Sequence, residues 1–302
     1  MAGPMIVENF GDLLDARFRK IYDKEFEENI NESMVPMLFG MENSDRNYEI
    51  VSGLGGMQDV PTFDGTIQYD RITQLYDKTF TFPERAMGFK VSRQLYDDDL
   101  FGKMDNKPWQ LAVSVARTRE KSGAGIFNGA FTGTDGPDSL SLCNAAHPYS
   151  PDDATTQSNA GSTALSATAI EATRRIGHTS IFNDRGELAN VRYDTIICAV
   201  NNEETAWEVI NSTGKVETAD NNRNFHQGRY DLAVWDRLTD TNNWFMIDSK
   251  LAKKFLLWWD RVKPEFNQDR DFDTFVAKWS VYMRYNVGWA AWQFVYGHNV
   301  SG

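Results

Sequence analysis

Cys143 and His147 are the residues of this sequence that most resemble a nucleophile and its general base. A cysteine attacks as its thiolate, which a neighbouring histidine can generate and stabilise. The pair lies in residues 129–161, a segment rich in Gly, Pro, Ser, Thr, Asn and Asp, and no third residue is identified that would orient the imidazole. Catalytic nucleophiles typically stand on a rigid turn. We therefore expect Cys143 to be buried and inert and His147 to be a surface residue, and a cytoplasmic Cys/His hydrolase is the weakest alternative.

A glycine-rich segment, Gly53-Leu54-Gly55-Gly56, follows a predicted strand at residues 48–51, as the phosphate-binding loop of a dinucleotide site would. The helix that such a loop requires does not follow, because Pro61 and alternating residues come next. The third glycine of the fingerprint is also absent. We interpret these glycines as a source of flexibility at the base of a β-hairpin.

Two acidic clusters contain the oxygen ligands that calcium prefers, Asp97-Asp98-Asp99 and the alternating set Asn267, Asp269 and Asp271. The second cluster has Phe272 and Lys278 where the calcium-loop template has Gly and Glu. We expect both to be solvated turns or helix caps. The remaining histidines are isolated in the sequence and no CxxC pair occurs, so the sequence predicts no metal site. No residue is assigned a catalytic, cofactor-binding or metal-binding role.

Composition narrows the classes of function further. The chain has 302 residues, of which 41% are hydrophobic, and 31 Lys and Arg against 43 Asp and Glu give a net charge of −12. A surface that grips phosphates, as in nucleic-acid-binding proteins, is therefore not expected. Two cysteines cannot form a disulfide scaffold. The sequence has neither a recognisable signal peptide nor an uninterrupted apolar stretch of about 20 residues, so we expect a cytoplasmic, soluble chain.

The elements that would position these residues begin with a charged helix. Residues 8–32 contain eight acids and four bases, and Phe10, Leu14, Phe18 and Ile21 recur at helical spacing. So narrow an apolar stripe indicates an arm that lies across the body of the protein or across a neighbouring subunit.

A long two-stranded hairpin is predicted next, from Ile50 to Val91, because apolar residues alternate with polar ones. Its turn is expected at Asp77-Lys78, or an irregularity at Pro83-Glu84. An isolated hairpin is marginally stable in water, so this one should lean on a partner.

The rest of the chain alternates helices and strands. Asp105-Asn106-Lys107-Pro108 is typical of a helix start, and the helix should run to about Phe127. A long loop over residues 129–161 and a second helix capped by Ser166 are expected to follow. Further predictions are a strand at 193–200, a helix at 206–210, strands at 232–236 and 244–248, a helical or extended segment at 250–259, and a long strand at 275–287 with one buried face.

This order of elements resembles the major capsid protein of tailed bacteriophages, the Hong Kong phage fold, and most closely its Mu-like major head subunit family. The similarity is carried by residues 142–148, by residues 164–172 leading to Asp184-Arg185-Gly186, and by residues 193–201 leading to 206–210. The resemblance implies an α+β fold. Its divisions would be an N-arm at 1–46, an extended E-loop hairpin at 47–95, a peripheral domain at 96–185 with a spine helix at 107–127, an axial domain at 186–263, and C-terminal peripheral strands at 264–302.

The resemblance also implies a function. The protein would self-assemble into hexamers and pentamers of an icosahedral shell that encloses packaged double-stranded DNA, with no enzymatic activity and no cofactor. Its expected partners are other copies of itself, a separate scaffolding protein or protease, a portal and possible decoration proteins, with no membrane contact. It would be found in the virion capsid after assembly in the host bacterial cytoplasm. An encapsulin-like shell around a cargo enzyme is the alternative with the same fold.

Overall fold

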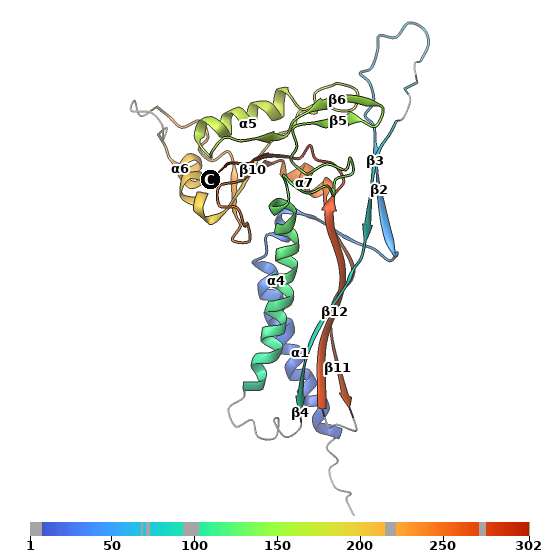
Figure 1. Ribbon diagram of the computed structural model, residues 1–302, viewed down its shortest axis with the longest axis vertical. Helices are drawn as coiled ribbons and strands as arrows, with labels where there is room; N and C mark the ends of the chain where they lie inside the picture. Colours follow the sequence, from blue (N-terminus) through green and yellow to red (C-terminus); the bar gives the residue numbers. More distant parts are fainter. Residues whose placement is uncertain are drawn as a thin grey trace, which may run out of the picture.

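The computed structural model describes residues 8–67, 69–70, 73–92, 103–214, 222–271 and 276–301, with the backbone alone for residues 8–15, Lys103 and Arg270. Figure 1 shows an elongated molecule with three parts: a long stem of helices beside strands, a broad head at one end of the stem, and a hairpin that rises along the side of the head. Helices and strands mix in both the stem and the head, as an α+β fold requires. Within the described residues, no helix is long and apolar enough to cross a bilayer.

The stem is built on a four-stranded sheet. Its strand order is β1 (Gly40–Asn43), β11 (Leu256–Asp271), β12 (Val276–Trp289) and β4 (Glu84–Ser92). Strands β11, β12 and β4 are antiparallel, and β1 pairs with β11 in parallel. Along β12 every second side chain is buried, namely those of Trp279, Val281, Met283 and Tyr285. The predicted long strand with one buried face is confirmed.

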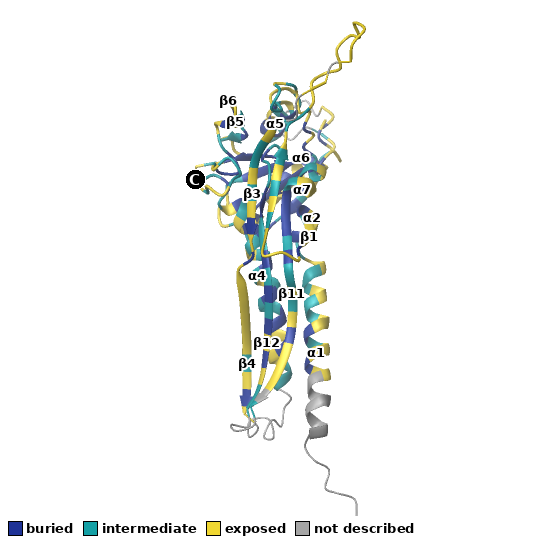
Figure 2. Ribbon diagram, turned by 90° about the vertical axis from the view of Figure 1, so that its right-hand side faces the viewer, coloured by how far each residue is buried: buried dark blue, intermediate teal, exposed yellow. Residues whose placement is uncertain are grey.

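Helices cover the buried face of this sheet. Helix α4 (Asn106–Asn128) confirms the predicted long helix and has Pro108 in its first turn, although the Asp105 side chain does not cap it and instead pairs with Arg17. Helix α1 (Glu8–Asn31) lies against α4 and β11, and the short helix α2 (Val35–Leu38) follows it. Phe18 and Tyr22 of α1 are buried against Trp279 and Phe266. Of the two placements expected for the N-terminal helix, the body of its own subunit is therefore the one observed (Figure 2).

The head contains a five-stranded sheet in the order β7 (Ala160–Gly161), β13 (Val295–His298), β10 (Trp244–Ile247), β8 (Thr195–Cys198) and β9 (Asp231–Val234). Its helices are α5 (Ala167–Thr179), α6 (Glu203–Asn211) and α7 (Ser249–Phe255), with a 3₁₀ turn at Val200–Asn202, whereas the 3₁₀ turn at Lys103–Asp105 leads into α4 of the stem. Ser166 accepts a hydrogen bond from the amide of Ala169, which confirms the predicted cap of α5. The strands predicted at 193–200, 232–236 and 244–248 and the helix predicted at 206–210 are confirmed within two or three residues of their ends.

Two expectations need correction. Residues 129–161 are not one long loop, because β5 (His147–Ser150) pairs with β6 (Asp153–Gln157) and β7 joins the head sheet. The hairpin consists of β2 (Tyr48–Leu54) and β3 (Gln74–Thr81), so Asp77-Lys78 lies inside a strand rather than at a turn. The alternative irregularity at Pro83 is observed: β3 ends at Thr81 and β4 begins at Glu84, where the chain leaves the hairpin and pairs with β12. The domain boundaries inferred from the resemblance stay predictions.

A buried ion pair joins the helical layer of the stem to its sheet. The two guanidinium nitrogens of Arg119 on α4 lie 2.8 and 3.0 Å from the two carboxylate oxygens of Asp260 on β11. The indole of Trp258 donates a hydrogen bond to the same carboxylate over 3.0 Å, and the Arg119 guanidinium lies over the rings of Trp258 and Tyr285. The Arg119 and Asp260 side chains are only 10% and 7% exposed, so each charge depends on the other.

Replacing Arg119 by Ala should lower the free energy of unfolding by about 3 kcal/mol, because it leaves the Asp260 carboxylate buried without its partner. Denaturant unfolding of the unassembled chain, followed by tryptophan fluorescence, measures this loss. Arg117→Ala, two residues away on the exposed face of the same helix, is the control and should change the free energy of unfolding little. A loss for Arg119→Ala no larger than that of the control would contradict the role given to the pair.

Candidate functional site

Cys143 and His147 do not form a catalytic pair. Cys143 is buried, with its thiol beside Gly297. His147 is completely buried, contrary to the expected surface position, because its ring stacks on Trp292 at 4.4 Å and its Nδ1 lies 2.6 Å from a carboxylate oxygen of Asp138. An acid that orients the imidazole is therefore present, although the sequence did not reveal it. The other nitrogen, Nε2, makes no hydrogen bond within the described part of the chain, so the imidazole does not reach the thiol.

Both thiols are in surroundings that disfavour the reactive thiolate. Burial raises the pKa of Cys198 to about 12, and it raises the pKa of Cys143 further still. A nucleophilic cysteine needs the opposite shift, which a helix N-terminus or a nearby positive charge would supply. The expectation that Cys143 is buried is confirmed, its inertness stays a prediction, and within the described residues its surroundings give the hydrolase alternative no support.

Alkylation of native protein by iodoacetamide at pH 7 should therefore be slow at both cysteines, and fast once the chain is unfolded in denaturant. Mass spectrometry of the two cysteine-containing peptides measures both rates. The unfolded chain serves as the reference for an accessible thiol. Labelling of native Cys143 at the rate of the unfolded chain would show that the thiol is activated or exposed.

The acidic clusters give no metal site in the structure. Asp97-Asp98-Asp99 lies outside the described residues. Asn267, Asp269 and Asp271 lie on β11 and pair across the sheet with β12, so they are neither a turn nor a helix cap, contrary to expectation. Asn and Asp favour turns locally, but here the backbone hydrogen bonds with β12 stabilise the extended conformation of β11. In the parts of the chain that the structure describes, no three His, Cys, Asp or Glu side chains converge as metal ligands would.

His298 has a structural role in the head sheet. It stacks on Trp244 at 4.1 Å, and its Nδ1 accepts a hydrogen bond from the amide of Thr163. The Thr173 hydroxyl donates to the carbonyl of Ala169, so Nε2 of His298 must carry the proton and donate to that hydroxyl over 2.8 Å. The imidazole is therefore neutral, and burial lowers its pKa to about 4.

Acid should consequently weaken the fold through His298. A histidine in the unfolded chain binds a proton near pH 6.5, whereas His298 in the folded chain binds one only near pH 4. The contribution of neutral His298 to the free energy of unfolding is therefore complete above pH 6.5 and is lost as the pH falls toward 4, by at most about 3 kcal/mol. Urea unfolding at a series of pH values should show that acid lowers the free energy of unfolding less in His298→Gln than in the parent. His178→Gln, at the end of α5, is the control, and its free energy of unfolding should change with pH as the parent's does. Equal slopes for all three chains would contradict the assignment.

The most prominent unpartnered surface is the loop at the tip of the hairpin, which projects beyond the head (Figures 1 and 2). It carries five large apolar side chains with exposed fractions from 66% to 96%, those of Met57, Val60, Phe63, Ile67 and Tyr69. We call these five residues the loop patch. Clustered exposed apolar side chains mark surfaces that bind another molecule. The sequence placed these residues within the alternating pattern of the predicted hairpin strands, but β2 ends at Leu54 and β3 begins at Gln74, so the patch lies in the loop between the strands. The one signal for it was a group of large apolar residues in a segment that also contains Gly, Pro and Asp.

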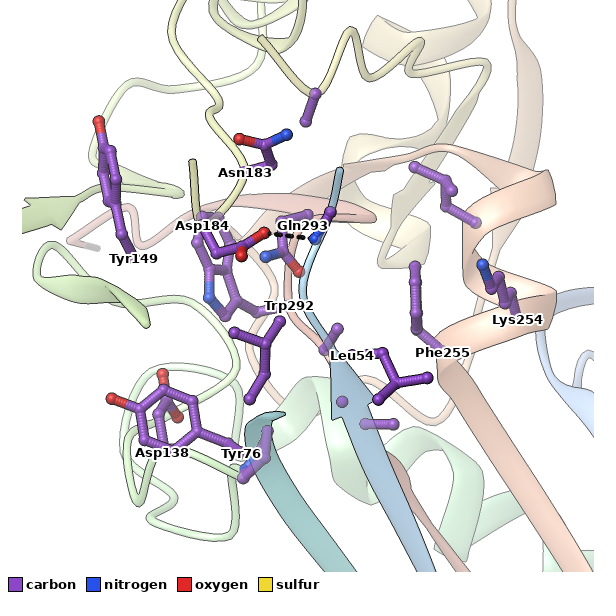
Figure 3. Close-up of a pocket in the computed structure, with 18 of the residues that line it drawn as sticks. Leu54, Tyr76, Asp138, Tyr149, Asn183, Asp184, Lys254, Phe255, Trp292 and Gln293 are labelled. Atoms are coloured by element: carbon purple, nitrogen blue, oxygen red, sulfur yellow. Dashed lines mark hydrogen bonds between the residues drawn. The ribbon is translucent and has the colours of Figure 1, made fainter. Parts of the chain in front are cut away.

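A cleft separates the hairpin from the head (Figure 3). Its volume is about 510 Å³, and it is lined on the hairpin side by Val51, Leu54 and Leu75 and on the head side by residues that include Phe182, Phe255 and Trp292. Figure 3 also shows Asp184 pointing toward the hairpin strand from the head. The hairpin therefore does not pack flat on its own subunit, and the loop patch stands at the end of a partly detached element.

Comparison with known proteins gives one family and a set of similar folds. A family model described as phage capsid protein matches residues 76–297. No curated protein matches the sequence.

Solved capsids share the fold over most of the chain. The capsid of cyanophage P-SCSP1u aligns with a TM-score of 0.59 at 10% identity and covers 88% of each chain. The mature capsid of bacteriophage PhiM1 aligns with a TM-score of 0.58 at 10% identity, covering 87% of this chain and 86% of that one. The capsid of bacteriophage JBD30, described as decorated with minor capsid protein trimers, aligns with a TM-score of 0.55 at 10% identity over 68% of this chain and 91% of that one. At these identities the similarity establishes the phage capsid fold predicted from the sequence.

Proposed function

The chain belongs to the phage capsid protein family and is a shell subunit, and we propose that its copies assemble into the hexamers and pentamers of an icosahedral head around packaged double-stranded DNA. The loop patch is the observation that carries this proposal. Its side chains have no place in the core of their own subunit, so they are available to bury on another copy. A contact between different surfaces of identical subunits generates a ring when its rotation closes, and rings are the units of a shell.

Many weak contacts suffice for such a shell. Complete burial of one Phe or Met side chain contributes about 1.5–3 kcal/mol, and part of this is lost because association orders the side chains and the subunits. A single loop patch on one neighbour is therefore a modest interaction. In a closed shell every subunit both gives and receives this contact, so the stability of the particle grows with the number of subunits joined.

The charge of the chain fits the interior of a DNA container. With a net charge of −12 the subunit offers no general surface for phosphate binding, so the packaged DNA would lie beside the shell without being held by it. The buried cysteines also favour a shell held by non-covalent contacts over one joined by disulfides.

The remaining features of the proposal come from the resemblance. We propose a structural, non-enzymatic role with separate scaffolding or protease, portal and decoration proteins as partners, and membership of the Mu-like subfamily. The decorated capsid of bacteriophage JBD30 supports the idea that a similar fold can carry a further protein on its shell. The family match favours a phage head over an encapsulin-like compartment, and the burial of Cys143 gives the hydrolase no support.

Polar substitution of the loop patch tests this function. Val60 and Phe63 are 96% and 72% exposed, so a Val60→Ser/Phe63→Ser chain should unfold at the parent's temperature yet give at least about tenfold fewer closed shells, because the apolar contact with the neighbour is lost. Negative-stain electron microscopy of the chain, expressed alone and with any adjacent scaffold or protease gene, counts the shells.

Thr62→Ser, a polar exchange in the same loop, is the matched control and should assemble like the parent. Parent-like shell numbers from the double variant would remove the loop patch from the assembly contact. An absence of shells and rings from the parent itself under both conditions would count against the proposed function.

A further inference from the structure

Two glycine-containing motifs that lie 128 positions apart in the sequence meet in the structure. The amide of Gly56 on the hairpin donates a hydrogen bond of 2.8 Å to a carboxylate oxygen of Asp184 in the head. The Arg185 side chain returns a bond of 3.3 Å to the carbonyl of Gly56. The Asp184 side chain is 5% exposed and the Arg185 side chain 20%, so the contact is largely shielded from water.

Close approach explains the glycines of the hairpin. A Cβ atom on Gly55 would lie 2.5 Å from the other carboxylate oxygen of Asp184, and one on Gly56 would lie 3.2 Å from the side-chain nitrogen of Asn183. A larger residue at position 55 would therefore push the hairpin away from the head. The segment interpreted from the sequence as a flexible hairpin base is instead the place where the hairpin backbone touches the head.

The head side of the contact is a tight turn. The amide of Asn183 donates to the carbonyl of Glu187, the Asn183 side chain accepts from the amides of Arg185 and Glu187, and Gly186 has a φ of +76° that favours glycine. The positions of Asp184 and Arg185 are therefore set by contacts within the turn itself.

The same turn holds both segments of the hairpin loop. On the outgoing segment, the amide of Asp59 donates to a carboxylate oxygen of Glu187 over 3.1 Å. On the returning segment, Asp70 forms an ion pair of 3.4 Å with Arg185. These contacts are made by the backbone of Gly56 and Asp59 and by the Asp70 side chain, and the five apolar side chains of the loop patch stay exposed.

The contacts at the two ends of the hairpin differ in chemistry. Its root is apolar, because Phe80 and Phe82 form a small buried cluster with Leu257 of β11. Its far end is held by hydrogen bonds and an ion pair, and the cleft of about 510 Å³ lies along the hairpin beside these contacts. When polar contacts separate, their groups can form hydrogen bonds with water instead, whereas an apolar cluster that separates gains no such replacement. The root is therefore the fixed end and the polar contact is the end that can open.

We propose that the Asn183–Glu187 turn is an intrasubunit latch that fixes the angle of the hairpin in the unassembled subunit and opens when a neighbouring subunit takes the loop patch. The existence of the latch does not depend on the proposed function. The opening of the latch on assembly does rest on the proposed function. A contact of this kind sets the direction of the loop patch in the unassembled subunit. It opens when the contacts that the loop patch makes with a neighbour are modestly more favourable than the contacts of the latch.

Hydrogen exchange of the full-length, unassembled chain tests the latch. In Asp184→Ala the peptide that contains residues 55–59 should exchange at least about tenfold faster than in the parent, because the amide of Gly56 loses its charged acceptor, while the peptides of β8 and β10 should not change. Asp236→Ala, which removes an exposed carboxylate elsewhere in the head, is the matched control. Parent-like exchange of residues 55–59 in Asp184→Ala would overturn the latch.

A second variant separates steric opening from loss of charge. Gly55→Ala keeps Asp184 and forces the hairpin outward, so it should also speed exchange of residues 55–59, and its effect should be smaller once Asp184 is already Ala. Gly125→Ala, on an open face of α4, is the control for adding a methyl group. If the effects of Gly55→Ala and Asp184→Ala on the exchange of residues 55–59 were fully additive, the two positions would not act through one contact, and the latch would be overturned.

Assembly then tests the opening step. If the latch sets the hairpin angle, Gly55→Ala and Asp184→Ala should stay folded and give shells whose size or closure differs from the parent's by electron microscopy. Faster exchange together with parent-like shells would overturn the role in assembly and leave the latch itself standing. An absence of shells from the parent itself would instead count against the proposed function and leave the exchange results, and so the latch, unaffected.

Discussion

The bidentate pairing of Arg119 with Asp260 is the contact on which the stem depends. The stem is only one sheet and one helical layer thick, so it cannot bury side chains on all sides as a deep core does. Large aromatic rings fill this thin interior, and the ion pair lies among them with its charge shared between α4 and β11. A buried charge that has one partner favours a single register of α4 on β11, because any other register leaves it unpaired.

Patterns that depend on a residue's own neighbours were readable from the sequence. The alternation along β12, the Pro108 start of α4 and the Ser166 cap of α5 all appear where they were predicted. Each is a local signal: one face of a strand is buried, a proline tolerates the first helical turn, and a serine hydroxyl satisfies a free amide.

Features that depend on a distant partner were not readable. β3 and β4 both carry alternating apolar residues, and only the strand that each pairs with shows that the hairpin ends at Thr81. His147 looks like a loop residue until Trp292, far along the chain, supplies the surface on which it stacks. The glycines at 55 and 56 gave a correct warning of unusual backbone, but their reason is a turn in the head that lies 128 residues away. Periodicity in a single sequence identifies an element without identifying its partner.

The passage of the chain from β3 into β4 has a mechanical consequence. A force that pulls the hairpin away from the stem is transmitted past Pro83 along the axis of β4, parallel to its ladder with β12. The nine residue pairs from Arg284↔Glu84 to Val276↔Ser92 then carry the load in shear and share it, whereas a force across the ladder would break them one at a time. When internal pressure stretches a shell, tension that reaches a subunit through its hairpin would be borne by the longest sheet of the molecule.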